Sequence, residues 1–232
     1  MTPLALARAA KRRLQRFRGK AALAVGRVAS SEPLSVHYGY DRGTPVDRYY
    51  IDAFLAKHAR DIRGSVLEVG DSAYSTRFGG KDVAEQHVLD VDPGNSGATI
   101  VGDVCDPAVL PSAAFDCIIF TQTLHVLYDM RAALVQLRRS LKPGGVLLVT
   151  APGITPVRPG PGYGWYWSLT GEALGRLLGE CFDEGKIDVA VQGNLFAATA
   201  FLHGAAVEEI RPRKLERVDL AYPVLVTGRA VA

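Results

Sequence analysis

Hydrophobic and polar positions along the chain fall into short blocks that alternate between strand-like and helix-like patterns. Apolar runs typical of buried strands occur at residues 65–69, 87–91, 99–101, 115–121 and 146–150. Helical spacing of apolar residues predicts helices over 45–60, 129–141, 170–178 and 194–209. Later strands are predicted at 187–192 and 222–231. Strands that alternate with helices indicate an α/β fold with a doubly wound, mostly parallel sheet of about seven strands.

Two segments depart from this rhythm. Residues 152–167 are rich in proline, glycine and aromatic residues, which predicts a loop without regular structure. The first 31 residues carry eight basic side chains and no acidic one, and their apolar residues fall near one helical face. We therefore divide the chain into a basic amphipathic helical arm with a substrate-side cover, residues 1–44, and one domain, residues 45–232.

Composition and charge narrow the classes of function. The chain has 232 residues, is 48% hydrophobic and carries a net charge of +3, which is typical of a globular protein. Because the arm holds so many of the bases, the domain itself is mildly acidic, which argues against a nucleic-acid-binding core. The arm is instead suited to docking on the domain, on a partner chain or on an anionic membrane surface.

Cysteine and histidine usage indicates no metal site. Three cysteines are too few and too scattered for a disulfide framework or a four-ligand zinc site. The five histidines do not fall at ligand spacings. No apolar run reaches the length of a membrane span. We expect a reduced, cytoplasmic setting.

The first predicted strand ends in the run Leu67-Glu68-Val69-Gly70-Asp71-Ser72. Glycine tolerates positive φ and has no Cβ, so an acid-x-Gly ending lets the backbone turn tightly under a ligand. Ordinary strand-to-helix turns share this pattern. The run alone therefore leaves a binding loop and a plain turn both open.

Acidic residues follow the second strand as well. Asp90 and Asp92 lie where a carboxylate accepts hydrogen bonds from a ribose diol. Asp92 is nearer the predicted strand end, and we lean slightly toward it. The alternative for each is a cap of the turn at Pro93.

The third and fourth strands bring further polar groups to the same edge. Gly102 and Asp103 follow the third strand, where an acid is able to accept from an exocyclic amine of adenine. The fourth strand delivers Thr121 and Gln122 to the floor of the expected crevice, at the carboxyl ends of the strands.

Taken in order, five motifs resemble the class I S-adenosylmethionine-dependent methyltransferases of the small-molecule type. The motifs are Glu68-x-Gly70, the acid of the second strand, Gly102-Asp103, the Phe115-Asp116 strand with His125 after it, and Leu141-Lys142-Pro143-Gly144-Gly145. The resemblance covers residues 45–151 well and the rest loosely. It implies a Rossmann-like sheet with an antiparallel last strand, and S-adenosyl-L-methionine lying over the tips of the first four strands.

The resemblance also implies roles for the residues that match its motifs. Asp90 or Asp92 holds the ribose, Asp103 the adenine amine, and Glu68 and Gly70 shape the loop under the amino-acid part of the cofactor. The predicted cofactor-binding residues are Glu68, Gly70, Asp71, Ser72, Asp90, Asp92, Gly102, Asp103, Thr121 and Gln122. The chain departs from the family at Ser72 and Tyr74, where the family's loop usually has glycine.

Candidate groups for catalysis and acceptor binding lie on both sides of this core. His125 follows the fourth strand and His37 precedes the domain; an imidazole suits a general base for a hydroxyl acceptor. Aromatic rings and an arginine are candidates for holding the acceptor. These predicted acceptor-binding residues are Tyr38, Arg42, Tyr163, Trp165 and Trp167.

The sequence thus predicts a methyltransferase for a small molecule. The expected reaction is O-methylation of a sugar-containing or secondary-metabolite acceptor. One alternative is a protein of the same fold that binds the cofactor and catalyses a cyclisation or elimination, which the altered glycine loop motivates. Another is a non-catalytic partner protein that docks through its basic arm.

Overall fold

The computed structural model describes residues 30–158, 160 and 164–232, which form two compact units. The first unit comprises the described chain up to Tyr50, with Ile154–Pro156 and Gln192–Val224. The second comprises Ile51–Gly153, Val157–Val191 and Leu225–Ala232. Residues 1–29 of the predicted arm lie outside the described residues.

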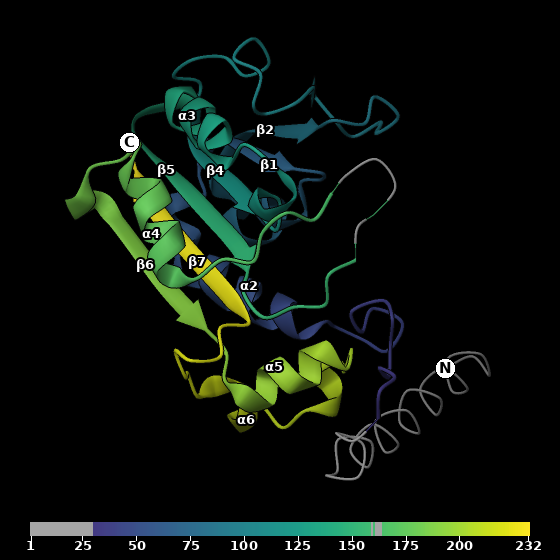
Figure 1. Ribbon diagram of the computed structural model, residues 1–232. Helices are drawn as coiled ribbons and strands as arrows, with labels where there is room; N and C mark the ends of the chain where they lie inside the picture. The colour runs from purple at the N-terminus through teal and green to yellow at the C-terminus, as the bar shows by residue number, and fades with distance from the viewer. Residues whose placement is uncertain (1–29, 159, 161–163) are drawn as a thin grey trace. The chain divides into compact units, whose positions relative to one another are not determined.

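The second unit is built on a seven-stranded sheet with the strand order β3-β2-β1-β4-β5-β7-β6 (Figure 1). Neighbouring strands from β3 to β5 are parallel, and β7 is antiparallel to β5. The strands are β1 (Gly64–Val69), β2 (Val83–Asp90), β3 (Ile100–Val101), β4 (Phe115–Thr121), β5 (Leu141–Pro152), β6 (Ile187–Gln192) and β7 (Leu225–Val231). The predicted α/β sheet of seven strands is confirmed.

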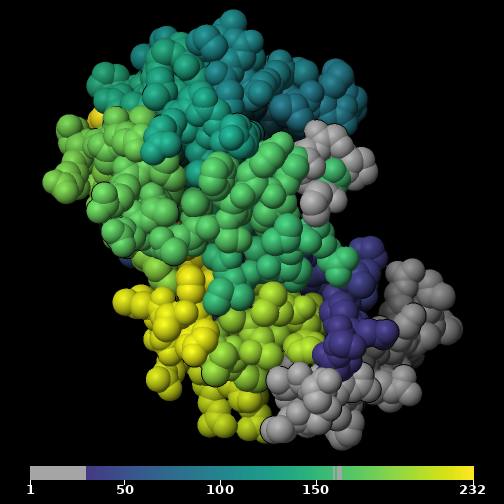
Figure 2. Space-filling view, in the orientation of Figure 1, coloured from purple at the N-terminus to yellow at the C-terminus, as the bar shows by residue number. Residues whose placement is uncertain are grey.

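Five α-helices of the described chain are distributed over the two units. The α-helices are α2 (Val46–Lys57), α3 (Met130–Ser140), α4 (Gly171–Gly179), α5 (Leu195–Leu202) and α6 (Arg213–Glu216). Helices α3 and α4 lie side by side over one face of the sheet (Figure 1), and their side chains belong to the teal and green surface that Figure 2 shows. Leu134 and Leu137 of α3 and Leu174 of α4 are fully buried there against strand residues such as Phe120.

The largest differences between predicted and observed boundaries are in β2, β5 and α5. Strand β2 begins at Val83, whereas the sequence predicts a start at residue 87. The exposed Glu85 and Gln86 lack an apolar pattern, so the sequence does not reveal this part of the strand. Strand β5 begins at Leu141, so the predicted turn at residues 142–145 belongs to the strand, where Phe115 pairs with Leu141 across a register shift. The helix predicted over 194–209 ends at Leu202.

The first unit ties the segment before α2 to the segment after α5. Thr44 donates through its backbone N–H and its hydroxyl to Glu208, both at 2.9 Å. The Tyr50 hydroxyl donates to the carbonyl of Leu215 at 3.0 Å. These contacts join residues up to Tyr50 to residues 192–224 within the first unit.

Candidate active site

Parallel pairing brings the predicted cofactor residues to one edge of the sheet. Because β1 lies between β2 and β4, and β3 lies beside β2, the residues that follow these strands meet at their carboxyl ends. Gly70, Asp90, Gly102 and Gln122 stand at or directly after those ends. In open α/β sheets, this edge is where ligands bind, and we refer to it as the crevice.

Glu68 holds the loop after β1 in shape. Its side chain is buried, with only 2% of the residue exposed, and accepts the backbone N–H groups of Tyr74 at 3.0 Å and Ser75 at 2.7 Å. Burial raises the pKa of this carboxyl group, while the two donated hydrogen bonds oppose that shift. Glu68 therefore acts on the loop that Ser72 and Tyr74 belong to.

Replacing Glu68 with glutamine should destabilise the protein. Glutamine offers one acceptor oxygen and turns an NH2 group toward a backbone donor, so one buried N–H loses its partner. We expect the free energy of unfolding to fall by about 1–3 kcal/mol, measured by urea denaturation. The exposed Glu184→Gln is the matched control and should change it by less than about 0.5 kcal/mol. Equal stability of the two variants would contradict this role.

Gly70 leaves an open space at the end of β1. Its φ is +83°, a left-handed conformation that favours glycine, and a Cβ placed there would meet no atom within 4 Å. Beside it, the Asp71 carboxylate accepts the N–H of Ala73 at 2.8 Å, and the carbonyl of Ser72 accepts the Ser75 hydroxyl at 3.1 Å. The space beside the Gly70 Cα is thus open to close approach by a ligand, while its N–H and carbonyl are hydrogen-bonded to Leu89 and Asn95.

Asp90 and Asp92 have different surroundings. Asp90 is the last residue of β2, and one of its carboxylate oxygens accepts the N–H of Asp92 at 3.0 Å. Asp92 lies beyond the strand, is exposed, and caps the following turn by accepting the N–H of Gly94 at 2.8 Å. The strand ends one residue earlier than the sequence suggested, and this geometry favours Asp90 where the sequence leaned toward Asp92.

Hydrogen bonds keep Asp90 ionised. The N–H of Asp92 and the side-chain amide of Asn95 donate to its carboxylate and lower its pKa. Asn95 was not singled out by the sequence, because an asparagine in a turn is usually there for the turn itself. No motif spacing signals its contact with Asp90.

Gly102, Asp103 and Gln122 complete the edge. A Cβ at Gly102 would lie 2.6 Å from a methyl group of Val109, and its φ is +153°, so the close packing requires glycine. Asp103 is exposed and accepts the N–H of Cys105 at 2.9 Å. Gln122, next to the half-buried Thr121, has a φ of +48°, an uncommon conformation for a residue with a side chain that is often found at functional sites.

His125 is buried beneath an aromatic segment. Its ring centroid lies 4.3 Å from that of Trp165, and its carbonyl accepts the N–H groups of Tyr166 at 3.0 Å and Trp167 at 3.2 Å. The Trp167 indole donates to the carbonyl of Leu127 at 3.0 Å. We call residues 164–167, fastened to residues 125–127, the aromatic clasp. Trp165 and Trp167 thus pack on their own unit.

Burial changes the proton chemistry of His125. The residue is 4% exposed, and its Nδ1 has no hydrogen-bond partner among the described residues. Desolvation lowers its pKa to about 4. The imidazole is therefore neutral at physiological pH, able to accept a proton but a weak base while the aromatic clasp covers it.

This shift predicts a pH dependence of stability. An unfolded chain binds a proton at His125 near pH 6.5 and the folded chain only near pH 4, so stability falls as the pH falls through that window. Between pH 7 and pH 5 His125 should account for about 2 kcal/mol of the loss. Urea denaturation at both pH values should show a smaller loss in His125→Phe than in the unchanged protein. An equal loss of unfolding free energy in the two proteins would contradict the prediction.

The remaining predicted residues lie elsewhere. His37, Tyr38 and Arg42 belong to the first unit, where His37 is exposed and Tyr38 packs its ring 6.4 Å from that of Phe201. The Arg42 guanidinium forms an ion pair with the buried Glu209, its Nε donating at 3.1 Å. Tyr163 lies outside the described residues.

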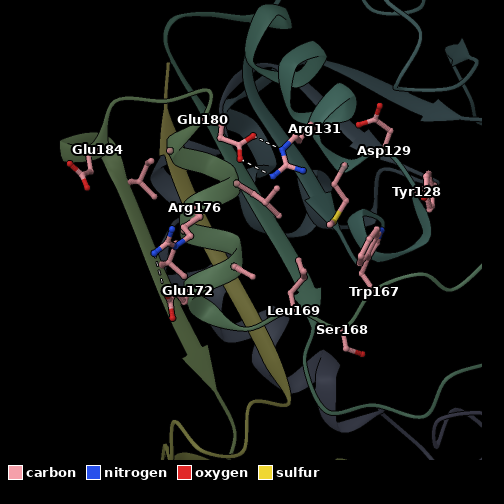
Figure 3. Close-up of a pocket in the computed structure, with 17 residues that line it drawn as sticks. Tyr128, Asp129, Arg131, Trp167, Ser168, Leu169, Glu172, Arg176, Glu180 and Glu184 are labelled. Atoms are coloured by element: carbon pink, nitrogen blue, oxygen red, sulfur yellow. Dashed lines mark hydrogen bonds and ion pairs between the residues drawn. The ribbon is translucent and has the colours of Figure 1, made fainter.

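A surface hollow of about 1270 Å³ runs along α4 and is lined from α3, α4 and β6 (Figure 3). Tyr128 and Trp167 stand at one end, and the Arg131–Glu180 ion pair, at 2.7 Å, crosses from α3 to the end of α4. None of the predicted cofactor residues lines it. The hollow is thus a separate feature from the crevice at the ends of β1 to β4.

No group of three or more potential metal ligands comes together in the described part of the chain. None of the helices described is long and apolar enough to cross a membrane.

Comparison with known proteins gives the class. Residues 54–149 match the model of the family described as methyltransferase domain. A SAM-dependent methyltransferase from Archaeoglobus fulgidus is 12% identical, with a TM-score of 0.53 and coverage of 80% of this chain and 94% of that one. One from Mesorhizobium loti is 15% identical, with a TM-score of 0.51 and coverage of 76% and 96%. No curated protein matches the sequence.

The matched residues run from α2 through most of β5, and so include every strand end of the crevice. The family match confirms, for residues 54–149, the predicted resemblance to methyltransferases, and the two solved structures share the fold of this chain.

Proposed function

We propose that the protein transfers a methyl group from S-adenosylmethionine to an oxygen atom of a small molecule. The observation that carries the proposal is the open space over Gly70, flanked by the ionised Asp90 at the end of the neighbouring strand. A backbone free of side chain beside a carboxylate acceptor fits the amino-acid and ribose parts of this cofactor. S-adenosylmethionine supplies an electrophilic methyl group when bound.

Different residues of the crevice would bind different parts of the cofactor. Asp90 accepts from the ribose hydroxyls and the exposed Asp103 from the adenine amine. Gly70 permits close approach of the cofactor's amino-acid part. Thr121 and Gln122 line the methionine end, where the left-handed backbone of Gln122 fixes the direction of the chain after β4.

His125 is the proposed base of the acceptor side. Its neutral imidazole is in the right form to take a proton from a hydroxyl group, and its unpartnered Nδ1 would receive it. The aromatic clasp must move for an acceptor to reach this atom, and Trp165 and Trp167 then offer ring faces to a sugar or aromatic acceptor. His37, Tyr38, Arg42 and Tyr163 remain predicted contributors.

A non-methylating reaction, such as a cyclisation or elimination, is the second candidate. It is favoured by the low pKa of His125, which makes a weak base, and by Ser72 and Tyr74 in the loop after β1.

The reduced cytoplasmic setting accords with three free cysteines in the described chain. Docking of the basic arm on a membrane or partner chain stays a prediction.

Calorimetric titration with S-adenosylmethionine and S-adenosylhomocysteine tests the proposal first. We expect micromolar binding of both, followed by release of the demethylated cofactor with a hydroxyl-bearing acceptor from a panel of sugars and aromatic metabolites. Tight binding without turnover on any acceptor would favour the non-methylating reaction. A folded protein that binds neither would overturn both.

A further inference from the structure

Asn95 links two loops of the crevice through one amide group. Its Nδ2 donates to the carbonyl of Gly70 at 2.7 Å and to the second carboxylate oxygen of Asp90, also at 2.7 Å. Both partners are acceptors, so the two hydrogens of the amide are each used once. The orientation of the amide is fixed independently, because its oxygen accepts the N–H of Gly97 at 3.0 Å.

The contacts around Asn95 join three strand ends. The N–H of Gly70 donates to the carbonyl of Leu89 at 3.0 Å, and the N–H of Gly102 donates to the carbonyl of Asp90 at 2.9 Å. Backbone contacts thus connect the loops after β1, β2 and β3. Asn95 supplies the side-chain contact in this set, and it reaches the Asp90 carboxylate directly.

Asn95 also serves its own turn, and that role is separable. The N–H of Asn95 donates to the carbonyl of Asp92 at 3.1 Å, and its own carbonyl accepts from Ala98 at 3.0 Å. These bonds and the one to Gly97 use the backbone and the amide oxygen only. An asparagine needed for the turn alone would have no use for both Nδ2 contacts.

We propose that Asn95 is a positioning residue of the cofactor site: its amide ties the Gly70 loop to the Asp90 loop and aims the Asp90 carboxylate at the ribose. This inference rests on the proposed function. It adds a residue that touches no cofactor itself and acts through Asp90. A carboxylate has about four acceptor sites, so Asp90 stays able to accept from a ribose hydroxyl beside its bonds from Asp92 and Asn95.

Two substitutions separate positioning from turn formation. Asn95→Asp keeps an oxygen for Gly97 but turns a second carboxylate toward Gly70 and Asp90. Asn95→Ala removes both roles. We expect S-adenosylhomocysteine, measured by calorimetry, to bind about tenfold more weakly to Asn95→Ala, and more weakly still to Asn95→Asp. Wild-type affinity in both variants would overturn the proposal.

Two further readouts would not respond to a purely structural role. In the Asp90→Ala background, adding Asn95→Ala should cost less affinity than it does in the unchanged protein, because its contact with Asp90 is already lost. In the protein without cofactor, the pKa of the Asp90 carboxyl group, followed by NMR, should rise in Asn95→Ala because a donor is lost. An additive double variant and an unchanged Asp90 pKa would each count against positioning.

The outcomes also distinguish this inference from the proposed function. If the unchanged protein binds no S-adenosylhomocysteine, the proposed function and this inference fall together. If it binds and the Asn95 variants bind equally well, only the positioning role is lost.

Discussion

Replacing Gly70 with alanine should remove most of the affinity for S-adenosylmethionine. The new methyl group would project into the open space at the end of β1, where the cofactor must come close to the backbone. We expect binding to weaken about a hundredfold, because an extra methyl group in a fitted site costs about 1–3 kcal/mol and the φ of +83° adds strain to the loop. Calorimetric titration measures the loss.

Gly144→Ala is a close control for this variant. Gly144 has a φ of +79°, and a Cβ there also meets no atom within 4 Å, but it lies early in β5 and away from the crevice. Both variants should lose about 1–2 kcal/mol of stability from backbone strain. Only Gly70→Ala should lose cofactor. Equal affinity of the two variants would place the cofactor elsewhere.

The second large effect is expected at the end of β2. Asp90→Ala should weaken S-adenosylhomocysteine binding about 10- to 100-fold, since hydrogen bonds to an ionised carboxylate are worth about 1.5–3 kcal/mol. The lowered pKa of Asp90 keeps it charged into mildly acidic solution, so affinity should stay constant from neutral pH down to the range where that carboxyl group takes up its proton.

Asp92→Ala is the comparison that decides between the two acids. Asp92 is exposed and its carboxylate is engaged in capping the turn at Gly94, so its loss should change the affinity by less than about threefold. A large loss in Asp92→Ala with a small one in Asp90→Ala would restore the assignment that the sequence slightly favoured. The two variants differ by two positions in one chain segment, which makes them well matched.

The sequence predicted the strands best where they are buried on both faces. Strand β4 was predicted to the residue, because Phe115 and the apolar run from Cys117 to Phe120 are typical of a buried strand. The start of β2 was missed because exposed polar residues such as Glu85 carry no period, and the start of β5 because Pro143 and Gly144 are typical of turns. In each case tertiary pairing decided against local pattern.

The candidate site was likewise predictable only in part from the sequence. Acids and glycines at strand ends were predictable, because parallel topology alone brings them to one edge. The contacts that set their roles were not. The choice of Asp90 over Asp92 depends on the last residue of β2, and the burial of His125 depends on Trp165, some forty residues later in the chain. Such contacts have no fixed spacing along the sequence, so no motif reveals them.

The aromatic clasp has a practical consequence. Trp165 and Trp167 are the two tryptophans of the whole chain, and both belong to this one segment. The intrinsic indole emission of the protein therefore reports on the clasp alone, one ring against the buried imidazole of His125 and the other hydrogen-bonded to Leu127. The molecule carries its own optical probe of whether the acceptor side is open or closed, readable in real time without a label.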